Sequence, residues 1–176
     1  MKKTIQNDLT QKYSKATIAT HWLTALLILI LFPLGKYMEN IETSEKMGLI
    51  TIHVILGIIV FVLTIIRTRS FFKHERPSNL ETGSKFNNKL TVWIHNVFYI
   101  ILFILSISGL AVMVLGGYAE ALQSNAPELI KNRSEITPMK VHGITSFIMM
   151  VLLVLHILGV LKHYIFTKEN TLKRIA

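Results

Sequence analysis

Four apolar runs, each long enough to cross a membrane, dominate this sequence. They cover about residues 17–34, 49–66, 90–115 and 138–166. A helix needs about 20 apolar residues to cross the hydrocarbon core of a bilayer, and the last two runs are long enough to tilt or protrude. Only helices and closed barrels satisfy their own backbone hydrogen bonds in lipid, and these runs are too long and continuous for barrel strands. The sequence therefore predicts an all-α integral membrane four-helix bundle, with residues 1–176 forming one transmembrane domain.

The distribution of positive charge predicts the orientation of the bundle. The N-terminal tail, the loop between the second and third runs and the C-terminal end together carry 14 of the 19 Lys and Arg residues: Lys2, Lys3, Lys12, Lys15, Arg67, Arg69, Lys73, Arg76, Lys85, Lys89, Lys162, Lys168, Lys173 and Arg174. The opposite side carries five: Lys36, Lys46, Lys131, Arg133 and Lys140. Because cytoplasmic loops hold the excess of basic residues, both termini are predicted to be cytoplasmic. The formal charge of +9 then reflects topology and contact with anionic lipid, and it argues against a nucleic-acid partner.

The absence of cysteine narrows the chemistry that the chain can support. None of the 176 residues is Cys. A disulfide framework, a thiolate metal site, an iron–sulfur cluster and a covalently attached c-type haem are therefore all excluded.

Five histidines lie within the apolar runs: His21, His53, His95, His142 and His156. An ionisable side chain inside a membrane span is costly, so each of them is a candidate functional residue. With a rise of about 1.5 Å per residue, His53 and His142 lie at the same depth near the outer face. His21 and His156 lie at the same depth near the cytoplasmic face.

The spacing of the two histidines in the last run indicates two stacked sites. His142 and His156 are 14 residues apart, which is almost four whole helical turns, so they share one face and lie roughly 21 Å apart. Two opposed imidazoles suit axial ligation of a porphyrin iron, whereas a tetrahedral zinc site would need more ligands than the two at the outer level. The main alternative is a haem-free transporter or assembly protein that uses its histidines to carry protons.

Two glycines agree with a flat ligand beside the helices. Gly57 follows His53 by four residues and Gly159 follows His156 by three, so each shares the face of its histidine. A porphyrin lying against a helix needs such a smooth patch. Small residues also let helices pack closely, which explains these glycines equally well.

Three histidines lie outside the two pairs matched by depth. His95 adds a third histidine to the cytoplasmic level, although six-coordinate iron takes two axial ligands, so it is expected to bind a haem propionate or another helix. His163 lies two turns beyond His156, where it is either an interfacial residue or a proton-exchanging contact for a quinone. His74 lies in a basic loop and is expected to be solvated.

The order and spacing of several motifs resemble the bacterial cytochrome b561 family. The resemblance covers nearly the whole chain. It includes Tyr13-Ser14 before His21-Trp22, Ile52-His53-Val54 with Gly57 and Arg67, His95 with Tyr99 and Gly109, His142, His156 and His163, and the closing run Asn170-Thr171-Leu172-Lys173-Arg174. The loop over residues 117–135 resembles the family least.

The resemblance implies a bacterial inner-membrane protein with two non-covalent b haems. The implied ligand pairs are His21 with His156 and His53 with His142, and His95 is implied to be a non-ligand. It also implies that ubiquinone accepts the electrons and that His163 lies on the quinone side. The likeness is strongest to the small stand-alone members of the family, which oxidise superoxide and need no protein partner.

Two redox functions follow from this likeness. In the first, superoxide is oxidised at the outer face, where Lys140 lies two residues before His142 and is expected to attract the anion. Six glutamates also lie in the outer loops, so their net charge does not support broad electrostatic steering. In the second, the chain is the quinone-linked cytochrome b subunit of a dehydrogenase or hydrogenase complex.

Overall fold

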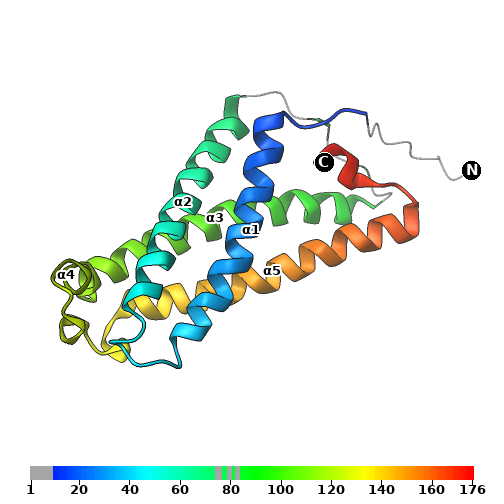
Figure 1. Ribbon diagram of the computed structural model, residues 1–176. Coiled ribbons are helices and arrows are strands. Elements are labelled where there is room, and N and C mark those ends of the chain that lie inside the picture. Colours follow the sequence, from blue (N-terminus) through cyan, green and yellow to red (C-terminus); the bar gives the residue numbers. More distant parts are fainter. Residues whose placement is uncertain (1–9, 74–76, 79–80, 82–83) are drawn as a thin grey trace, which may run out of the picture.

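Four long helices make up most of the computed structural model (Figure 1), which describes residues 10–73, 77–78, 81 and 84–176. The long helices are α1 (Lys15–Met38), α2 (Met47–Lys73), α3 (Lys85–Leu115) and α5 (Thr137–Thr167). The short helix α4 (Tyr118–Ser124) and the 3-10 helices η1 (Pro127–Leu129) and η2 (Arg133–Glu135) connect α3 to α5, and η3 (Thr171–Arg174) follows α5.

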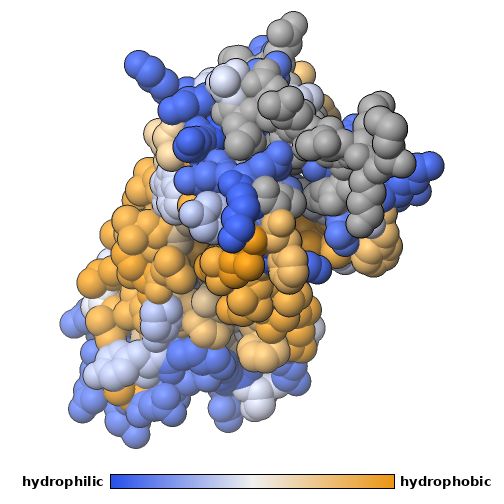
Figure 2. All heavy atoms as spheres, turned by 90° about the vertical axis from the view of Figure 1, so that its right-hand side faces the viewer, coloured by the Kyte–Doolittle hydropathy of each residue, from blue (hydrophilic) through white to orange (hydrophobic). Residues whose placement is uncertain are grey.

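All four long helices are long and apolar enough to cross a membrane. At most 22% of the residues in the most apolar stretch of each helix are buried inside the protein. Figure 2 shows the result: a broad hydrophobic belt separates two hydrophilic ends. Apolar side chains that face outward in this way need lipid around them. The predicted all-α, four-helix membrane protein is therefore confirmed.

The bundle is built from two helix pairs. Helix α1 packs on α2, α3 packs on α5, and α2 and α3 join the two pairs. In Figure 1 the α1–α2 pair is inclined to the α3–α5 pair, and the start of α1 lies at the same end of the bundle as the C-terminus. The cytoplasmic location of that end, and of both termini, stays a prediction.

Local capping explains where the helices begin and end. The Ser14 side chain accepts a hydrogen bond from the Thr17 backbone N–H and caps α1. Ser84 caps α3 in the same way, so this helix begins at Lys85. The helix therefore begins before the apolar run predicted from about residue 90, and the extent of that run as a membrane span stays a prediction.

A left-handed glycine separates the end of α3 from the following short helix. Helix α3 ends at Leu115, and Gly117 adopts a φ of 76°, a left-handed conformation that favours glycine. A Cβ at Gly117 would also clash with the backbone carbonyl of Leu129. The short helix α4 begins directly after Gly117.

A tightly packed apolar layer fills the middle of the bundle. Its buried members come from all four long helices: Leu27, Val60, Leu63, Leu102 and Met149. Met149 is 1% exposed and lies midway in sequence between the two α5 histidines. The layer therefore separates the two histidine levels and excludes water between them.

The C-terminal segment closes the end of the bundle that carries both termini. Arg174 is 4% exposed, and its guanidinium donates hydrogen bonds to the backbone carbonyls of Gln11 (3.1 Å) and Ser78 (2.9 Å). The indole N–H of Trp22 donates to the carbonyl of Ile175 at 2.8 Å. These contacts join the chain ends and the α2–α3 connection to the start of α1.

Replacing Arg174 with alanine should therefore destabilise this end of the bundle. The substitution leaves two carbonyls without their charged donor, which is expected to lower the free energy of unfolding by about 2 kcal/mol. Thermal unfolding of the full-length protein in detergent measures the loss. The matched control is Lys173→Ala, which removes an exposed cation from the same 3-10 helix. Equal stabilities of the two variants would contradict this role for Arg174.

Four residues used in the sequence argument lie outside the described part of the chain: Lys2, Lys3, His74 and Arg76.

Candidate cofactor sites

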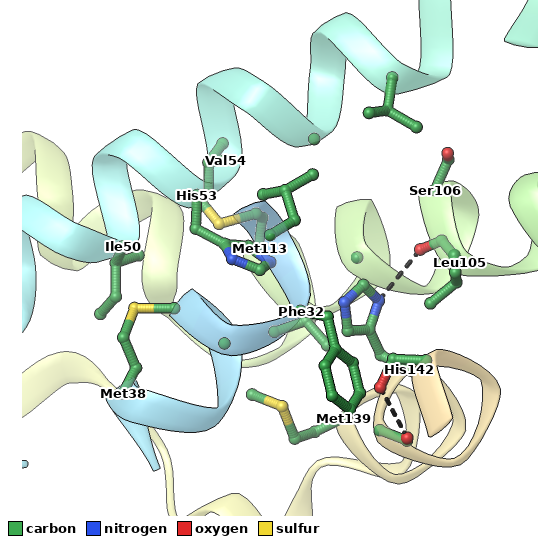
Figure 3. Close-up of a pocket in the computed structure, with 18 of the residues that line it drawn as sticks. Phe32, Met38, Ile50, His53, Val54, Leu105, Ser106, Met113, Met139 and His142 are labelled. Atoms are coloured by element: carbon green, nitrogen blue, oxygen red, sulfur yellow. Dashed lines mark hydrogen bonds between the residues drawn. The ribbon is translucent and has the colours of Figure 1, made fainter. Parts of the chain in front are cut away.

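Two histidines from different helices face each other near the end of the bundle that lies opposite the termini (Figure 3). We call this pair, His53 on α2 and His142 on α5, the outer site. The centroids of the two imidazole rings are 6.3 Å apart and the ring planes cross at 69°. A metal–imidazole nitrogen bond is about 2 Å long and the ring centre lies about 1.2 Å behind the nitrogen, so a metal ion between two imidazoles separates the centroids by roughly 6.5 Å. The observed separation fits this geometry.

Hydrogen bonding orients His142 for metal binding. Its Nδ1 lies 3.0 Å from the backbone carbonyl of Leu105 and 3.2 Å from the hydroxyl of Ser108. A carbonyl oxygen can only accept a hydrogen bond. Nδ1 therefore carries the proton and donates a hydrogen bond to the Leu105 carbonyl. The other ring nitrogen, Nε2, then keeps its lone pair, which is the tautomer that a metal ligand needs.

His53 lacks such a partner. Its Nδ1 is buried and makes no hydrogen bond within the described residues. A buried nitrogen without a partner costs free energy. His53 therefore has a buried ring nitrogen that a bound group could satisfy.

Glycines on the facing helices make room for both rings. A Cβ built on Gly109 of α3 would lie 3.2 Å from Cε1 of His142. A Cβ on Gly35 of α1 would lie 3.4 Å from Cε1 of His53. The first contact is tighter than ordinary van der Waals packing. Sequence reasoning gave neither glycine this role, because neither shares a helix with the histidine that it accommodates.

The outer site opens into an apolar cavity of about 250 Å³. The labelled side chains of Phe32, Met113 and Met139 lie around the two imidazoles (Figure 3). Gly57 lines the same cavity, and a Cβ placed on it would meet no atom within 4 Å. A flat apolar ligand therefore has open space against α2 beside His53. Paired nitrogens, apolar walls and a smooth helix face together fit a haem.

The charged residues that line this cavity carry a net positive charge. Lys36, Lys46 and Arg133 line it together with a single carboxylate, Glu39. Glu39 accepts a hydrogen bond of 2.8 Å from Arg133 and lies 3.1 Å from the ammonium of Lys36. The Arg133 guanidinium holds the pKa of the Glu39 carboxyl below its usual value. The outer loops as a whole are nearly neutral, but the cations concentrate at the cavity.

Lys140 lies apart from this cluster of cations. It is an exposed residue near the start of α5, and the residues that line the cavity do not include it. The contact of Lys140 with superoxide therefore stays a prediction.

Three histidines gather at the other level, which we call the inner site: His21 on α1, His95 on α3 and His156 on α5. The rings of His95 and His156 pack edge to face with centroids 5.3 Å apart. This separation is smaller than the roughly 6.5 Å that an intervening metal ion requires. Nδ1 of His21 lies 3.4 Å from Nη2 of Arg67 on α2.

His95 has its own hydrogen-bond partner. Its Nδ1 donates to the carbonyl of Thr91 one turn earlier at 2.7 Å, so its Nε2 also keeps a lone pair. His95 is therefore in a ligand-competent tautomer but lies too close to His156 to share an ion with it in this arrangement. The assignment of His21 and His156 as the inner ligands stays a prediction.

His163 and Gly159 lie at the cytoplasmic end of α5 in the predicted orientation. Nε2 of His163 is 3.0 Å from a carboxylate oxygen of Glu169, and both side chains are largely buried. The sequence did not predict this pair. Gly159 is exposed, and a Cβ on it would meet nothing within 4 Å. Its predicted role beside a haem remains untested.

Comparison with known proteins identifies the family. The family model for prokaryotic cytochrome b561 matches residues 12–176, which is nearly the whole chain. The chain belongs to this family. It is also 26% identical over 171 residues to cytochrome b561 homolog 1 of Escherichia coli (strain K12), an alignment that covers 93% of this chain and 96% of the relative.

Family membership agrees with the geometry of the outer site. Members of this family are membrane proteins that transfer electrons with haem b, so the resemblance noted in the sequence is confirmed. The cavity between His53 and His142 suits such a haem on independent structural grounds.

Proposed function

We propose that this chain is a di-haem cytochrome that takes electrons from superoxide at its outer end and delivers them to membrane ubiquinone. The observation that carries the proposal is the outer pair, in which His53 and His142 face each other with centroids 6.3 Å apart across an apolar cavity. Haem, when bound, supplies reversible one-electron iron chemistry. The protein supplies the histidine ligands, sets the separation between the two sites and keeps water out.

The second haem is proposed to bind at the inner site, with His21 and His156 as its ligands. Support comes from the depth of these residues and from the apolar layer around Met149, which separates the two levels. Because His142 and His156 share one helix face, α5 supplies one ligand to each site. His95 is proposed to remain a non-ligand that donates its Nδ1 proton to Thr91.

The cations at the cavity mouth support an anionic electron donor. Superoxide carries one negative charge, and Lys36, Lys46 and Arg133 outnumber the single Glu39 where the cavity opens. Local cations around an opening raise the concentration of anions there and accelerate their encounter with the site. The exposed Lys140 is proposed to add to this attraction.

The opposite end of the bundle is proposed to reduce ubiquinone. Two superoxide ions each lose one electron to give two molecules of dioxygen. One ubiquinone takes up both electrons and two protons to become ubiquinol. The His163–Glu169 pair is proposed to exchange these protons with the cytoplasm, since a histidine and a carboxylate in contact can pass a proton between them.

Pulsed superoxide tests the proposed reaction. Purified protein with a short-chain ubiquinone should reduce one quinone for every two superoxide ions, at a rate well above spontaneous dismutation. If superoxide fails to reduce the haem centres, superoxide is not the donor. Copurification of a dehydrogenase or hydrogenase that reduces them rapidly would then support the alternative of a complex subunit.

Charge variants test where superoxide approaches. Arg133→Gln should lower the rate with superoxide several-fold at low salt, and added salt should reduce the difference between wild type and variant. Lys140→Gln, made in parallel, measures the contribution of the cation outside the cavity. A salt-independent rate in the wild-type protein would contradict electrostatic attraction at either position.

Gly109→Val should weaken haem binding at the outer site alone. Even a Cβ at this position lies 3.2 Å from the His142 ring, so the added methyl groups must displace the imidazole from its hydrogen bond to Leu105. Loss of such orientation typically reduces metal affinity by about tenfold or more. The haem content of purified protein measures the effect. The control is Gly48→Val, in an exposed position where a Cβ meets nothing within 4 Å.

A further inference from the structure

An arginine is turned into the bundle at the inner site. Arg67 lies six residues before the end of α2, inside a helix that is apolar enough to cross the membrane. Its Nη2 is 3.4 Å from Nδ1 of His21, and its guanidinium carbon lies 5.5 Å from the centroid of the Tyr99 ring. These contacts come from α1 and α3. Arg67 therefore points between the helices and does not extend along α2 towards water.

Among the residues that the structure describes, no carboxylate pairs with Arg67. A guanidinium stays protonated in proteins, and burying it without an anion is costly. None of the ion pairs among the described residues includes Arg67, and its Nε is buried without a hydrogen-bond partner. The cation–π contact with Tyr99 offsets only part of that cost.

The contact with His21 conflicts with iron ligation by the same ring. Arg67 can only donate hydrogen bonds, so in this contact Nδ1 of His21 must be the unprotonated nitrogen. A neutral imidazole then carries its proton on Nε2. Binding iron through Nε2 requires the opposite tautomer, with the proton on Nδ1. Arg67 must therefore release His21, and it needs another acceptor, when the inner site is filled.

We propose that Arg67 binds a propionate carboxylate of the haem at the inner site. The inference rests on the proposed function, because it assumes that a haem binds there with His21 as ligand. A carboxylate matches the planar fork of a guanidinium and neutralises its charge. It also provides the acceptor that the described protein residues lack, and it frees Nδ1 of His21 to carry a proton.

Haem and its dimethyl ester test this role, because the ester has the same ring but no carboxylates. The titration uses full-length protein with His142→Ala, which is expected to leave only the inner site available. This protein should bind haem at least tenfold more tightly than the ester. Adding Arg67→Gln should lower the affinity for haem, so that haem and its ester bind with nearly equal affinity.

Two further variants keep the result interpretable. Arg69→Gln removes an exposed cation from the same helix and should preserve the preference for haem. Arg67→Lys keeps a positive charge and should retain part of the preference if Arg67→Gln fails to fold. The midpoint potential of the inner haem should also fall in Arg67→Gln, because a nearby cation stabilises the reduced iron.

The outcomes separate this inference from the proposed function. Equal affinities for haem and its ester while Arg67 is present would overturn the role of Arg67 and leave the di-haem function standing. A preference that persists unchanged in Arg67→Gln would do the same. Wild-type protein that binds no haem at either site would overturn both proposals.

Discussion

Replacing His142 with alanine is expected to remove one haem from the protein and to leave the other in place. Replacing His53 should remove the same haem. The two rings face each other with centroids 6.3 Å apart, so each would supply one of the two axial bonds to a single iron. Without one imidazole, the apolar cavity offers no replacement nitrogen, since the cations at its mouth are donors only.

Haem content and absorption spectra of the purified variants measure this result. His142→Ala and His53→Ala should each show about half of the wild-type haem content and the same surviving spectrum. Ser108→Ala should lose less haem than either alanine variant, because the Leu105 carbonyl still accepts a hydrogen bond from Nδ1 of His142 and fixes its tautomer. If the two alanine variants lost spectrally different haems, the two residues could not be ligands of one iron.

His95→Ala is expected to retain both haems, whereas His21→Ala and His156→Ala should each lose the inner one. His95 and His156 pack edge to face at 5.3 Å, which leaves too little space for an ion between them. His21 lies on α1, at the depth predicted for the partner of His156. The difference between His95 and His21 is thus the largest functional contrast expected at the inner level.

The same spectra decide this contrast. The inner pair would be wrong if His95→Ala lost a whole haem while His21→Ala kept it. His163→Ala serves as the control, because its ring pairs with Glu169 two turns beyond His156 and should hold neither haem. That variant should keep full haem content and be slow only in quinone reduction.

The sequence was sufficient to predict the helices because apolar length decides membrane crossing. Four runs of spanning length became four long helices, and the predicted depths of His53 and His142 correspond to a facing pair. Helix α3 begins before the apolar run, since Ser84 caps the helix there. Capping depends on one polar side chain, which hydrophobic periodicity does not reveal.

Features that depend on contact between helices could not be predicted from the sequence. Gly35 and Gly109 make room for histidines on other helices, and His163 is paired with Glu169 beyond the helix end. The local excess of cations at the outer cavity was also missed. Summing charge over whole loops averages Lys46 and Arg133 with glutamates that lie elsewhere, whereas folding brings these cations to one opening.

The most direct test of the account is the haem content of the purified protein. The difference between dithionite-reduced and oxidised spectra, combined with extraction and quantification of the haem, counts b-type centres per chain. We expect two non-covalent b haems per chain, one for each histidine level. A spectrum without b-type bands, or a single haem that both His53→Ala and His156→Ala abolish, would contradict it.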